Sequence, residues 1–195
     1  MSQSRYPNWE ALRDSDPSFI DEYTLEARLG SGGFGVVYAA TAADGSPVAL
    51  KVLRPELSDD PALRRRLARE AEALRRVEGD RTVQVLEVVI DDDQTYLVME
   101  RLEGVTLDDL VKDEGPLQAA SLWPVAEGLI DALGDIHAAG VVHRDLKPSN
   151  VIVGPDGVKV LDFGISVIAE QTSLTQTGAF VGTAAWISPE QIRDE

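Results

Sequence analysis

A polar segment at residues 142–150 carries the strongest chemical signal in the sequence. It reads Val142-His143-Arg144-Asp145-Leu146-Lys147-Pro148-Ser149-Asn150 and is bounded by apolar runs. A carboxylate can accept or orient a hydroxyl proton, a lysine can balance phosphate charge, and an amide oxygen can bind a hard cation. Asp145, Lys147 and Asn150 are therefore candidates for phosphoryl-transfer chemistry, which we favour over a merely solvated loop.

A second acidic position lies twelve residues after Asn150, in Asp162-Phe163-Gly164. It follows an apolar run at residues 158–161, so Asp162 is expected at the end of a strand. A carboxylate there can reach a Mg²⁺ ion that is bound to phosphate oxygens. By itself the triplet is typical of an ordinary turn, and only its distance from residues 142–150 indicates a metal site.

A glycine-rich segment, Leu29-Gly30-Ser31-Gly32-Gly33-Phe34-Gly35, lies in the first fifth of the chain. Glycines at this spacing occur in plain hairpins and in dinucleotide sites as well as in phosphate-binding loops. A dinucleotide site would lead from a strand into a helix, whereas the β-branched Val36 and Val37 predict a second strand. Backbone N–H groups of the glycines could then approach phosphate oxygens with no Cβ in the way.

Lys51 lies one predicted strand further on, in Val48-Ala49-Leu50-Lys51. An isolated lysine in a strand is usually solvated, but beside a phosphate-binding loop it would supply the cation for the α- and β-phosphates. The helix predicted over residues 61–77 offers Glu70 and Glu72 as its anionic partner. We expect Glu70, because it borders the apolar stripe of this helix, whereas Glu72 points about 200° away from it.

The elements that must position these residues fall into a strand-rich half and a helix-rich half. Apolar periodicity predicts strands at residues 23–29, 36–41, 48–53, 83–90, 95–100, 151–153 and 158–161, and helices at 61–77, from 106 and at 118–139. This order predicts an α+β fold of two lobes. Residues 1–22 are predicted to be a flexible leader, 23–100 the first lobe and 101–195 the second.

Together these motifs resemble those of the protein kinases, and in detail the bacterial Ser/Thr kinases of eukaryotic type. The resemblance covers roughly residues 23–190. It rests on the glycine-rich loop, the strand lysine, the helix glutamate, His-Arg-Asp-Leu-Lys-Pro-x-Asn and Asp-Phe-Gly, in that order. It implies the two-lobed protein-kinase fold, with an antiparallel sheet and one helix in the N-lobe and a mostly helical C-lobe. It also implies ATP and Mg²⁺ as cofactors.

The resemblance assigns a role to each candidate residue. Lys51 would pair with Glu70 and hold ATP phosphates, and Asp145 would orient or accept the proton of the substrate hydroxyl. Lys147 would stabilise the transferring phosphoryl group, and Asn150 and Asp162 would hold Mg²⁺. The expected nucleotide-binding residues are Leu29, Gly30, Gly32, Gly35, Val37, Ala49, Lys51, Met99, Glu100, Leu102, Ile152 and Asp162, with backbone groups of Glu100 and Leu102 on the purine edge. Several of the apolar members are expected to be core residues as well.

Proteins with Ser and Thr hydroxyls are the substrates that the resemblance implies. Lys147 within its motif and Thr183 after Gly182 match the Ser/Thr-specific pattern. Thr175 and Thr177 match the positions at which such kinases phosphorylate themselves, which implies self-association during the reaction. Threonines are also common in exposed loops, so these two positions are a hypothesis.

The composition narrows the remaining classes of partner. The 195 residues carry 18 Lys and Arg against 34 Asp and Glu, a formal net charge of −16, which disfavours binding to nucleic acids and anionic membranes. There is no cysteine, which excludes disulfides and thiolate metal sites and fits a cytoplasmic location. The N-terminus is not typical of a signal peptide, and no apolar run has the length of a transmembrane helix.

The last residues depart from the family pattern and leave other functions open. Ser188-Pro189-Glu190 replaces the usual Ala-Pro-Glu, and the family's catalytic domain continues for on the order of 80 residues beyond this segment. Without those residues we expect His143, Leu146 and the helix face at residues 129–136 to meet water. One alternative function is a nucleotide-binding pseudoenzyme or regulatory module. Another is a small-molecule phosphotransferase, which is disfavoured because such enzymes generally lack Leu-Lys-Pro-x-Asn.

Overall fold

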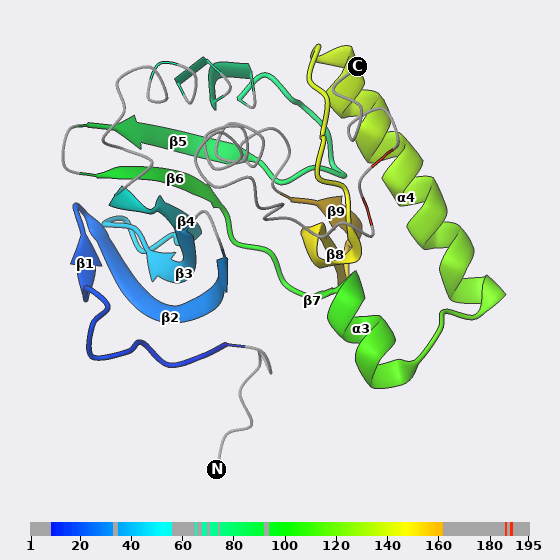
Figure 1. Cartoon of the computed structure of the whole chain (residues 1–195), viewed down its shortest axis with the longest axis horizontal. Coiled ribbons are helices and arrows are strands. Elements are labelled where there is room, and N and C mark those ends of the chain that lie inside the picture. The colour runs from blue at the N-terminus through cyan, green and yellow to red at the C-terminus, as the bar shows by residue number, and fades with distance from the viewer. Residues whose placement is uncertain are drawn as a thin grey trace.

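The computed structural model of the chain describes residues 9–32, 35–55, 65, 68–69, 71–73, 75–91, 94–161, 186 and 188. Most of the first half forms one antiparallel sheet with the strand order β1-β2-β3-β4-β6-β5. Its strands are β1 (Phe19–Ile20), β2 (Tyr23–Gly32), β3 (Gly35–Thr41), β4 (Pro47–Leu53), β5 (Val85–Ile90) and β6 (Thr95–Glu100). The long strand β2 curves around β3 and β4 (Figure 1).

Alternating side chains give this sheet two apolar faces. On the outer face, Tyr38, Leu50 and Val98 belong to one buried cluster, which also contains Ile20, Tyr23, Leu25, Ala40, Val48 and Tyr96. On the inner face, Ala49, Leu97 and Met99 pack in a second cluster together with residues of the other half of the chain. The strands are rich in β-branched and aromatic residues, which suit a surface that is covered on both sides.

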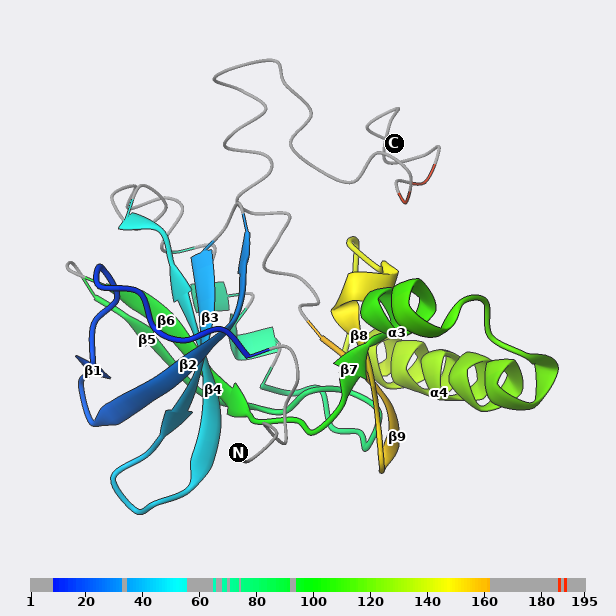
Figure 2. The same cartoon turned by 90° about the horizontal axis from the view of Figure 1, so that it is seen from below.

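The second half contains a small antiparallel sheet and two helices. The sheet has the order β7 (Val105–Thr106), β8 (Val151–Gly154), β9 (Gly157–Val160), and η1 (Pro148–Asn150) leads into β8. Helices α3 (Leu107–Glu114) and α4 (Ala119–Ala138) both lie on the side of this sheet that faces away from the large sheet (Figure 2). The Thr106 hydroxyl caps α3 by accepting a hydrogen bond from the N–H of Asp109 at 3.0 Å.

Helix α4 packs on β9 through one face. Its buried residues recur at intervals of three and four, as expected for a single helical face; they are Val125, Gly128, Ala132 and Ile136. The absence of a side chain at Gly128 permits close packing, because a Cβ there would lie 3.0 Å from Cβ of Val158. No helix among the described residues combines the length and the apolar character needed to cross a membrane.

The two halves meet where residues 81–83 run beside β9. Thr82 forms a parallel bridge with Val160, Val83 N–H donates to Val160 O at 3.0 Å, and Val160 N–H donates to Arg81 O at 2.8 Å. Ala132, Ile136 and Val160 are fully buried there, in the same cluster as Ala49 and Met99 of the large sheet. The inner face of the large sheet is therefore continuous with the core of the second half.

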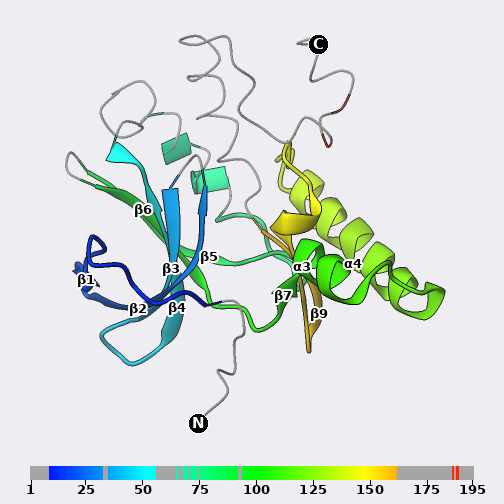
Figure 3. The ribbon, with the colours of Figure 1, turned by 60° about the horizontal axis from the view of Figure 1, so that its bottom comes forward.

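The N-terminal residues differ from the flexible leader predicted over residues 1–22. Residues 1–8 lie outside the described residues, but Glu10 forms a bridge with Arg28, and β1 pairs with the start of β2. This dark blue segment crosses over β2 in Figure 3. This order could not be predicted, because the ion pair that holds the segment, Asp16 with Arg28, belongs to no periodic pattern. The predicted division between residues 100 and 101 stays a prediction.

The expectation that His143, Leu146 and residues 129–136 meet water is wrong for His143 and Ile136. His143 is 2% exposed and Ile136 is fully buried, while Leu146 is half-buried. Ile136 and Leu146 pack with Val141 and Val160 in the inner cluster, and His143 contacts backbone groups of Leu161 and Asp145. Ile130, within the range 129–136, does meet water at 69% exposed, and Leu122, Trp123 and Val142 on this half are exposed as well.

Candidate active site

Within the part of the chain that the structure describes, the Asp145 carboxylate is held through one of its oxygens. Lys147 Nζ lies 2.7 Å from Asp145 Oδ2, and Asn150 Nδ2 donates to the same oxygen at 3.0 Å. Asn150 Nδ2 also donates to the Asp145 carbonyl at 2.8 Å, which closes the turn that leads into η1. Among the described residues these side-chain contacts both fall on Oδ2, which leaves Oδ1 as the candidate oxygen for proton transfer. The structure thus brings together the three residues predicted from residues 142–150.

His143 anchors this loop from beneath. Its ring is 2% exposed; Nδ1 accepts from the Asp145 N–H at 3.3 Å, and Nε2 lies 3.0 Å from the carbonyl of Leu161. These two contacts fit the tautomer in which Nδ1 accepts and Nε2 donates to Leu161 O. The next residue, Arg144, has φ = 62°, a left-handed conformation that is costly for a side chain of this size. Such strain persists only where neighbouring contacts fix the backbone.

The same contacts extend toward the predicted metal residue. Leu161 N–H donates to Asn150 O at 2.8 Å, so both backbone groups of Leu161 are held by the catalytic loop. Asp162 itself, the next residue, lies outside the described residues, as do Glu70, Thr175 and Thr177. Asn150 suits a hard cation, because its amide nitrogen is used twice within the loop and its amide oxygen is the atom that remains.

Lys51 lies on the inner strand β4, and the residue is only 5% exposed. It is flanked in the sheet by Val37 of β3 and Leu97 of β6. A lysine is rarely buried to this degree unless a charged group accompanies it. Its predicted partner Glu70 is not among the described residues, so the pairing stays a prediction.

The glycine-rich segment joins two strands, as predicted, and not a strand to a helix. Gly30 pairs with Val37 and Gly32 pairs with Gly35, which makes a tight hairpin between β2 and β3. The glycines differ in their surroundings. A Cβ at Gly35 would lie 1.9 Å from Val52 O, whereas a Cβ at Gly30 or Gly32 would meet nothing within 4 Å. Gly35 is therefore required by strand packing, and the open space at Gly30 and Gly32 leaves their backbone accessible.

The residues predicted to contact adenine lie mostly in one place. Ala49 and Met99 are buried in the inner cluster, and Leu29, Val37 and Leu102 pack against it. Ile152 lies apart on β8 in the small sheet, where its Cγ2 approaches Gly104. Five of the six predicted apolar contacts thus belong to or pack against one cluster; four come from β2, β3, β4 and β6, and Leu102 follows β6.

Glu100 makes contacts that the sequence did not predict. Its N–H donates to Gln84 O at 3.0 Å, and its Oε1 accepts from Gln84 N–H at 2.9 Å and from Lys159 Nζ at 2.6 Å. The N–H and the side chain of Glu100 are thus engaged within the fold, and its predicted backbone contact with the purine stays a prediction. Lys159 is 59 positions away along the chain, a distance over which no spacing rule could have linked the two residues.

The protein kinase domain matches residues 23–195 of the chain. This chain belongs to the protein kinase family. Its curated relatives include the probable serine/threonine-protein kinase PkwA of Thermomonospora curvata, 43% identical over 93% of this chain and 24% of that protein. They also include the serine/threonine-protein kinase PknL of Mycobacterium tuberculosis, 37% identical over 98% of this chain and 47% of that protein. The kinase chain thus spans less than half the length of these relatives.

Solved kinase structures share the fold. The M. tuberculosis PknI kinase domain superposes with a TM-score of 0.69 at 28% identity, covering 77% of this chain and 62% of that one. Rad53 residues 1–466 in complex with AMP-PNP gives 0.72 at 28% identity, over 89% of this chain and 43% of that one. The two-lobed kinase fold is confirmed, and so is the similarity to bacterial Ser/Thr kinases of eukaryotic type.

Proposed function

We propose that this kinase chain binds ATP with Mg²⁺ and transfers the γ-phosphoryl group to Ser and Thr hydroxyls of proteins. The observation that carries the proposal is the arrangement at Asp145, where Lys147 and Asn150 both engage Oδ2 and leave Oδ1 toward a substrate. Support for the nucleotide comes from the solved relative that is in complex with the ATP analogue AMP-PNP. Protein substrates are the class implied by the names of the relatives.

Each site residue of this chain would have a separate role in phosphoryl transfer. Asp145 Oδ1 accepts a hydrogen bond from the substrate hydroxyl and orients its oxygen. It takes the proton as that oxygen bonds to the γ-phosphorus and the bond from the γ-phosphorus to the leaving ADP breaks. Lys147 and Lys51 supply positive charge beside the phosphates. Asn150 and Asp162 would hold Mg²⁺, which when bound neutralises phosphate charge. Water would be excluded from the purine by apolar residues that already belong to or pack against one cluster: Leu29, Val37, Ala49, Met99 and Leu102.

Asp145→Asn tests the proposed role of the carboxylate. The amide keeps the size of the side chain but cannot take a proton, so phosphorylation of a generic protein substrate should fall by about 100- to 10,000-fold. Binding of Mg²⁺-ATP, measured by titration calorimetry, should change little. Asp131→Asn is the matched control, because Asp131 is exposed on α4. Near-normal transfer by Asp145→Asn would refute the proposal.

The same experiment separates the kinase from the pseudoenzyme alternative. A pseudoenzyme would bind Mg²⁺-ATP and transfer no phosphate in the unchanged protein. The positions described here for catalysis all carry the side chains that transfer requires, which favours the kinase. Lys51→Met should weaken nucleotide binding as well as transfer, because it removes a cation from the phosphates.

We also propose that Thr175 or Thr177 is the first residue to be phosphorylated by a second copy of this kinase. Both lie between Asp162 and Ser188 in the sequence, in the segment that matches the self-phosphorylated region of the family. Mass spectrometry over a time course should find phosphate there first, at a rate that rises with protein concentration. Early phosphate confined to residues 1–22, or to tyrosine, would contradict this.

A further inference from the structure

Residues 9–21, called the N-terminal strap below, pair with the outer edge of β2. Glu10 N–H donates to Arg28 O at 3.0 Å and Arg28 N–H donates to Glu10 O at 2.8 Å. Closer to β1, Leu25 N–H donates to Ser18 O at 3.0 Å. The strap therefore satisfies backbone groups along β2 beyond the two residues that pair with β1, and serves as an edge strand would.

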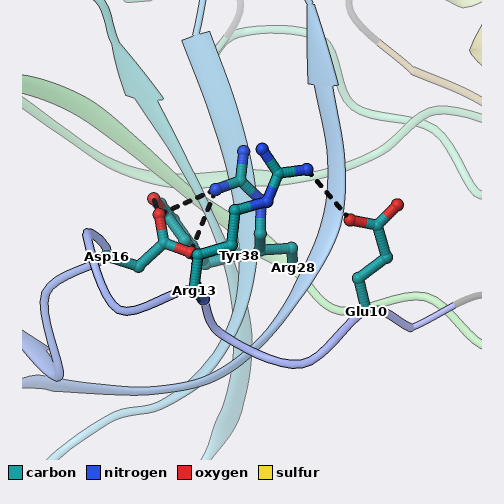
Figure 4. Close-up of polar contacts among 5 residues, drawn as sticks. All are labelled: Glu10, Arg13, Asp16, Arg28 and Tyr38. Carbon is teal, nitrogen blue, oxygen red and sulfur yellow. Dashed lines mark hydrogen bonds and ion pairs between the residues drawn. The ribbon is translucent and has the colours of Figure 1, made fainter.

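A buried polar cluster holds the middle of the strap (Figure 4). Arg28 Nη1 donates to both oxygens of Asp16, at 2.7 and 3.0 Å, and the Tyr38 hydroxyl donates to Asp16 Oδ1 at 2.9 Å. The N–H of Arg13 donates to Asp16 Oδ2 at 2.8 Å. The side chains of Arg28 and Asp16 are 7% and 6% exposed. Breaking a pair buried to this degree leaves an uncompensated charge, so the strap is firmly tied to β2 and β3.

Arg28 occupies a critical position in β2. The register between β2 and β3 shifts between Leu25 and Ala27 and again between Arg28 and Gly30. Side-chain alternation cannot fix the register of a short stretch between two such irregularities. Both backbone groups of Arg28 are fixed instead by Glu10, and its guanidinium by Asp16. The strap thereby sets the position of the next two residues, Leu29 and Gly30, which begin the predicted nucleotide site.

Trp9, the first residue of the strap, contacts the connection after β6, where the predicted purine contacts lie. Arg101 Cζ lies 5.3 Å from the ring centroid of Trp9, a cation–π contact. Arg101 Nη1 also donates to Glu26 Oε2 at 2.8 Å and to Ala40 O at 3.4 Å. Arg101 stands between Glu100 and Leu102, whose backbone groups are the predicted purine contacts. Strap residues thus contact the neighbours of both Leu29 and Leu102.

We propose that the N-terminal strap is a positioning element of the nucleotide site, acting through Arg28 on the glycine-rich loop and through Arg101 on the connection after β6. This inference rests on the proposed binding of ATP. None of the strap residues touches the reacting atoms. Weakening the strap should therefore raise the Kd and KM for Mg²⁺-ATP, because the site is less often correctly formed, and leave kcat at saturating ATP nearly unchanged.

Asp16→Ala tests the arm that acts through Arg28. We expect the Kd for Mg²⁺-ATP to rise about fivefold, and amide hydrogen exchange of residues 25–32 to accelerate. Asp16→Asn keeps an acceptor oxygen for Arg28 and Tyr38 and should recover part of the affinity. Asp14→Ala is the matched control, since Asp14 is an exposed strap residue two positions away, and it should alter neither measurement.

Trp9→Ala tests the arm that acts through Arg101 and does not depend on the fold surviving the loss of Asp16. It should raise the Kd for Mg²⁺-ATP, whereas Trp123→Ala, which removes a 68% exposed tryptophan from α4, should not. An unchanged Kd in both Asp16→Ala and Trp9→Ala, with normal Mg²⁺-ATP binding by the unchanged protein, would overturn the inference and leave the proposed function intact. A fall in kcat with an unchanged Kd would also overturn it. Failure of the unchanged protein to bind Mg²⁺-ATP would instead remove the proposed function, and the inference with it.

Discussion

Two aspartates of this kinase show how hydrogen bonding decides what a carboxylate can do. Each oxygen of Asp16 accepts two hydrogen bonds, from Arg28 and from either Tyr38 or the Arg13 backbone. Both lone pairs of each oxygen are thereby used. Among the residues that the structure describes, Lys147 and Asn150 contact Asp145 through Oδ2 alone. The saturated carboxylate therefore serves the fold, while the half-satisfied one suits proton transfer.

The first prediction concerns the contribution of Asp16 to stability as a function of pH. Burial acts to raise its pKa, but the bonds from Arg13, Tyr38 and Arg28 outweigh burial, so the pKa of Asp16 lies below its ordinary value. A carboxyl whose pKa is lowered by folding stabilises the fold above its unfolded pKa of about 3.9, and this contribution disappears as the pH falls through the folded value. Urea unfolding should show Asp16→Asn less stable than the unchanged protein at pH 7, with the gap closing below about pH 4.

Asp14→Asn should show no such gap at either pH. A difference between Asp16→Asn and the unchanged protein that persists undiminished in acid would mean that the ion pair with Arg28 is not its source. The same burial and hydrogen bonding raise the pKa of Tyr38 to about 12. Its hydroxyl accordingly remains a donor to Asp16 throughout the range of this experiment.

Substitution by Ala should lower stability at Gly35 and leave it nearly unchanged at Gly32. Gly35→Ala places a Cβ 1.9 Å from Val52 O, so the backbones of β3 and β4 must move apart. We expect a loss of about 1–3 kcal/mol in the free energy of unfolding. Gly32→Ala meets nothing within 4 Å and should change stability by less than about 0.5 kcal/mol. Gly32→Ala should nevertheless weaken Mg²⁺-ATP binding, because a methyl group would occupy the space near the phosphates. Equal affinities for Mg²⁺-ATP in Gly32→Ala and the unchanged protein would refute the predicted approach of the phosphates to Gly32.

At the scale of elements, the parts that follow a period were predictable and the parts that depend on single long-range contacts were not. The alternation of β3, β4 and β6 and the three-four spacing in α4 gave these elements to within a few residues, because burial of one face leaves a trace in the sequence. The catalytic loop was found from residue types, which its chemistry restricts. The strap and the Glu100–Lys159 contact were missed, since an ion pair between distant residues leaves no local pattern. The predicted exposure of His143 and Ile136 was wrong, because both are buried by contacts within the described part of the chain.

Helix α4 offers a matched pair of isoleucines for the next prediction. Ile136 is fully buried against β9 and the large sheet, whereas Ile130 is 69% exposed. Ile136→Ala should lower the free energy of unfolding by about 2–5 kcal/mol, since it leaves a cavity in the core that joins the two halves. Ile130→Ala should change it by less than about 0.5 kcal/mol. Similar losses in the two variants, measured by urea unfolding, would show that the two faces of α4 are assigned incorrectly.

At the scale of the whole molecule, an excess of negative charge opposes folding. The formal net charge of −16 arises from 34 acidic and 18 basic residues, and compaction brings these like charges together. A few exposed ion pairs act in the other direction, such as Lys112 with Asp108 at 2.7 Å. Pairs of that kind contribute only about 0–1 kcal/mol each. The net repulsion of the acidic surface should therefore exceed what the exposed pairs contribute.

The last prediction follows from that balance: added salt should stabilise this kinase. Raising NaCl from about 10 mM to 150 mM shortens the screening length from about 30 Å to 8 Å, which weakens repulsion across the surface more than attraction between groups in contact. The midpoint of thermal unfolding should therefore rise. Glu127→Gln together with Asp131→Asn removes two exposed negative charges from one face of α4, and the salt effect should be smaller in this double variant. A midpoint that falls with salt would mean that the ion pairs dominate, and that the acidic surface is compensated locally by the basic residues beside it.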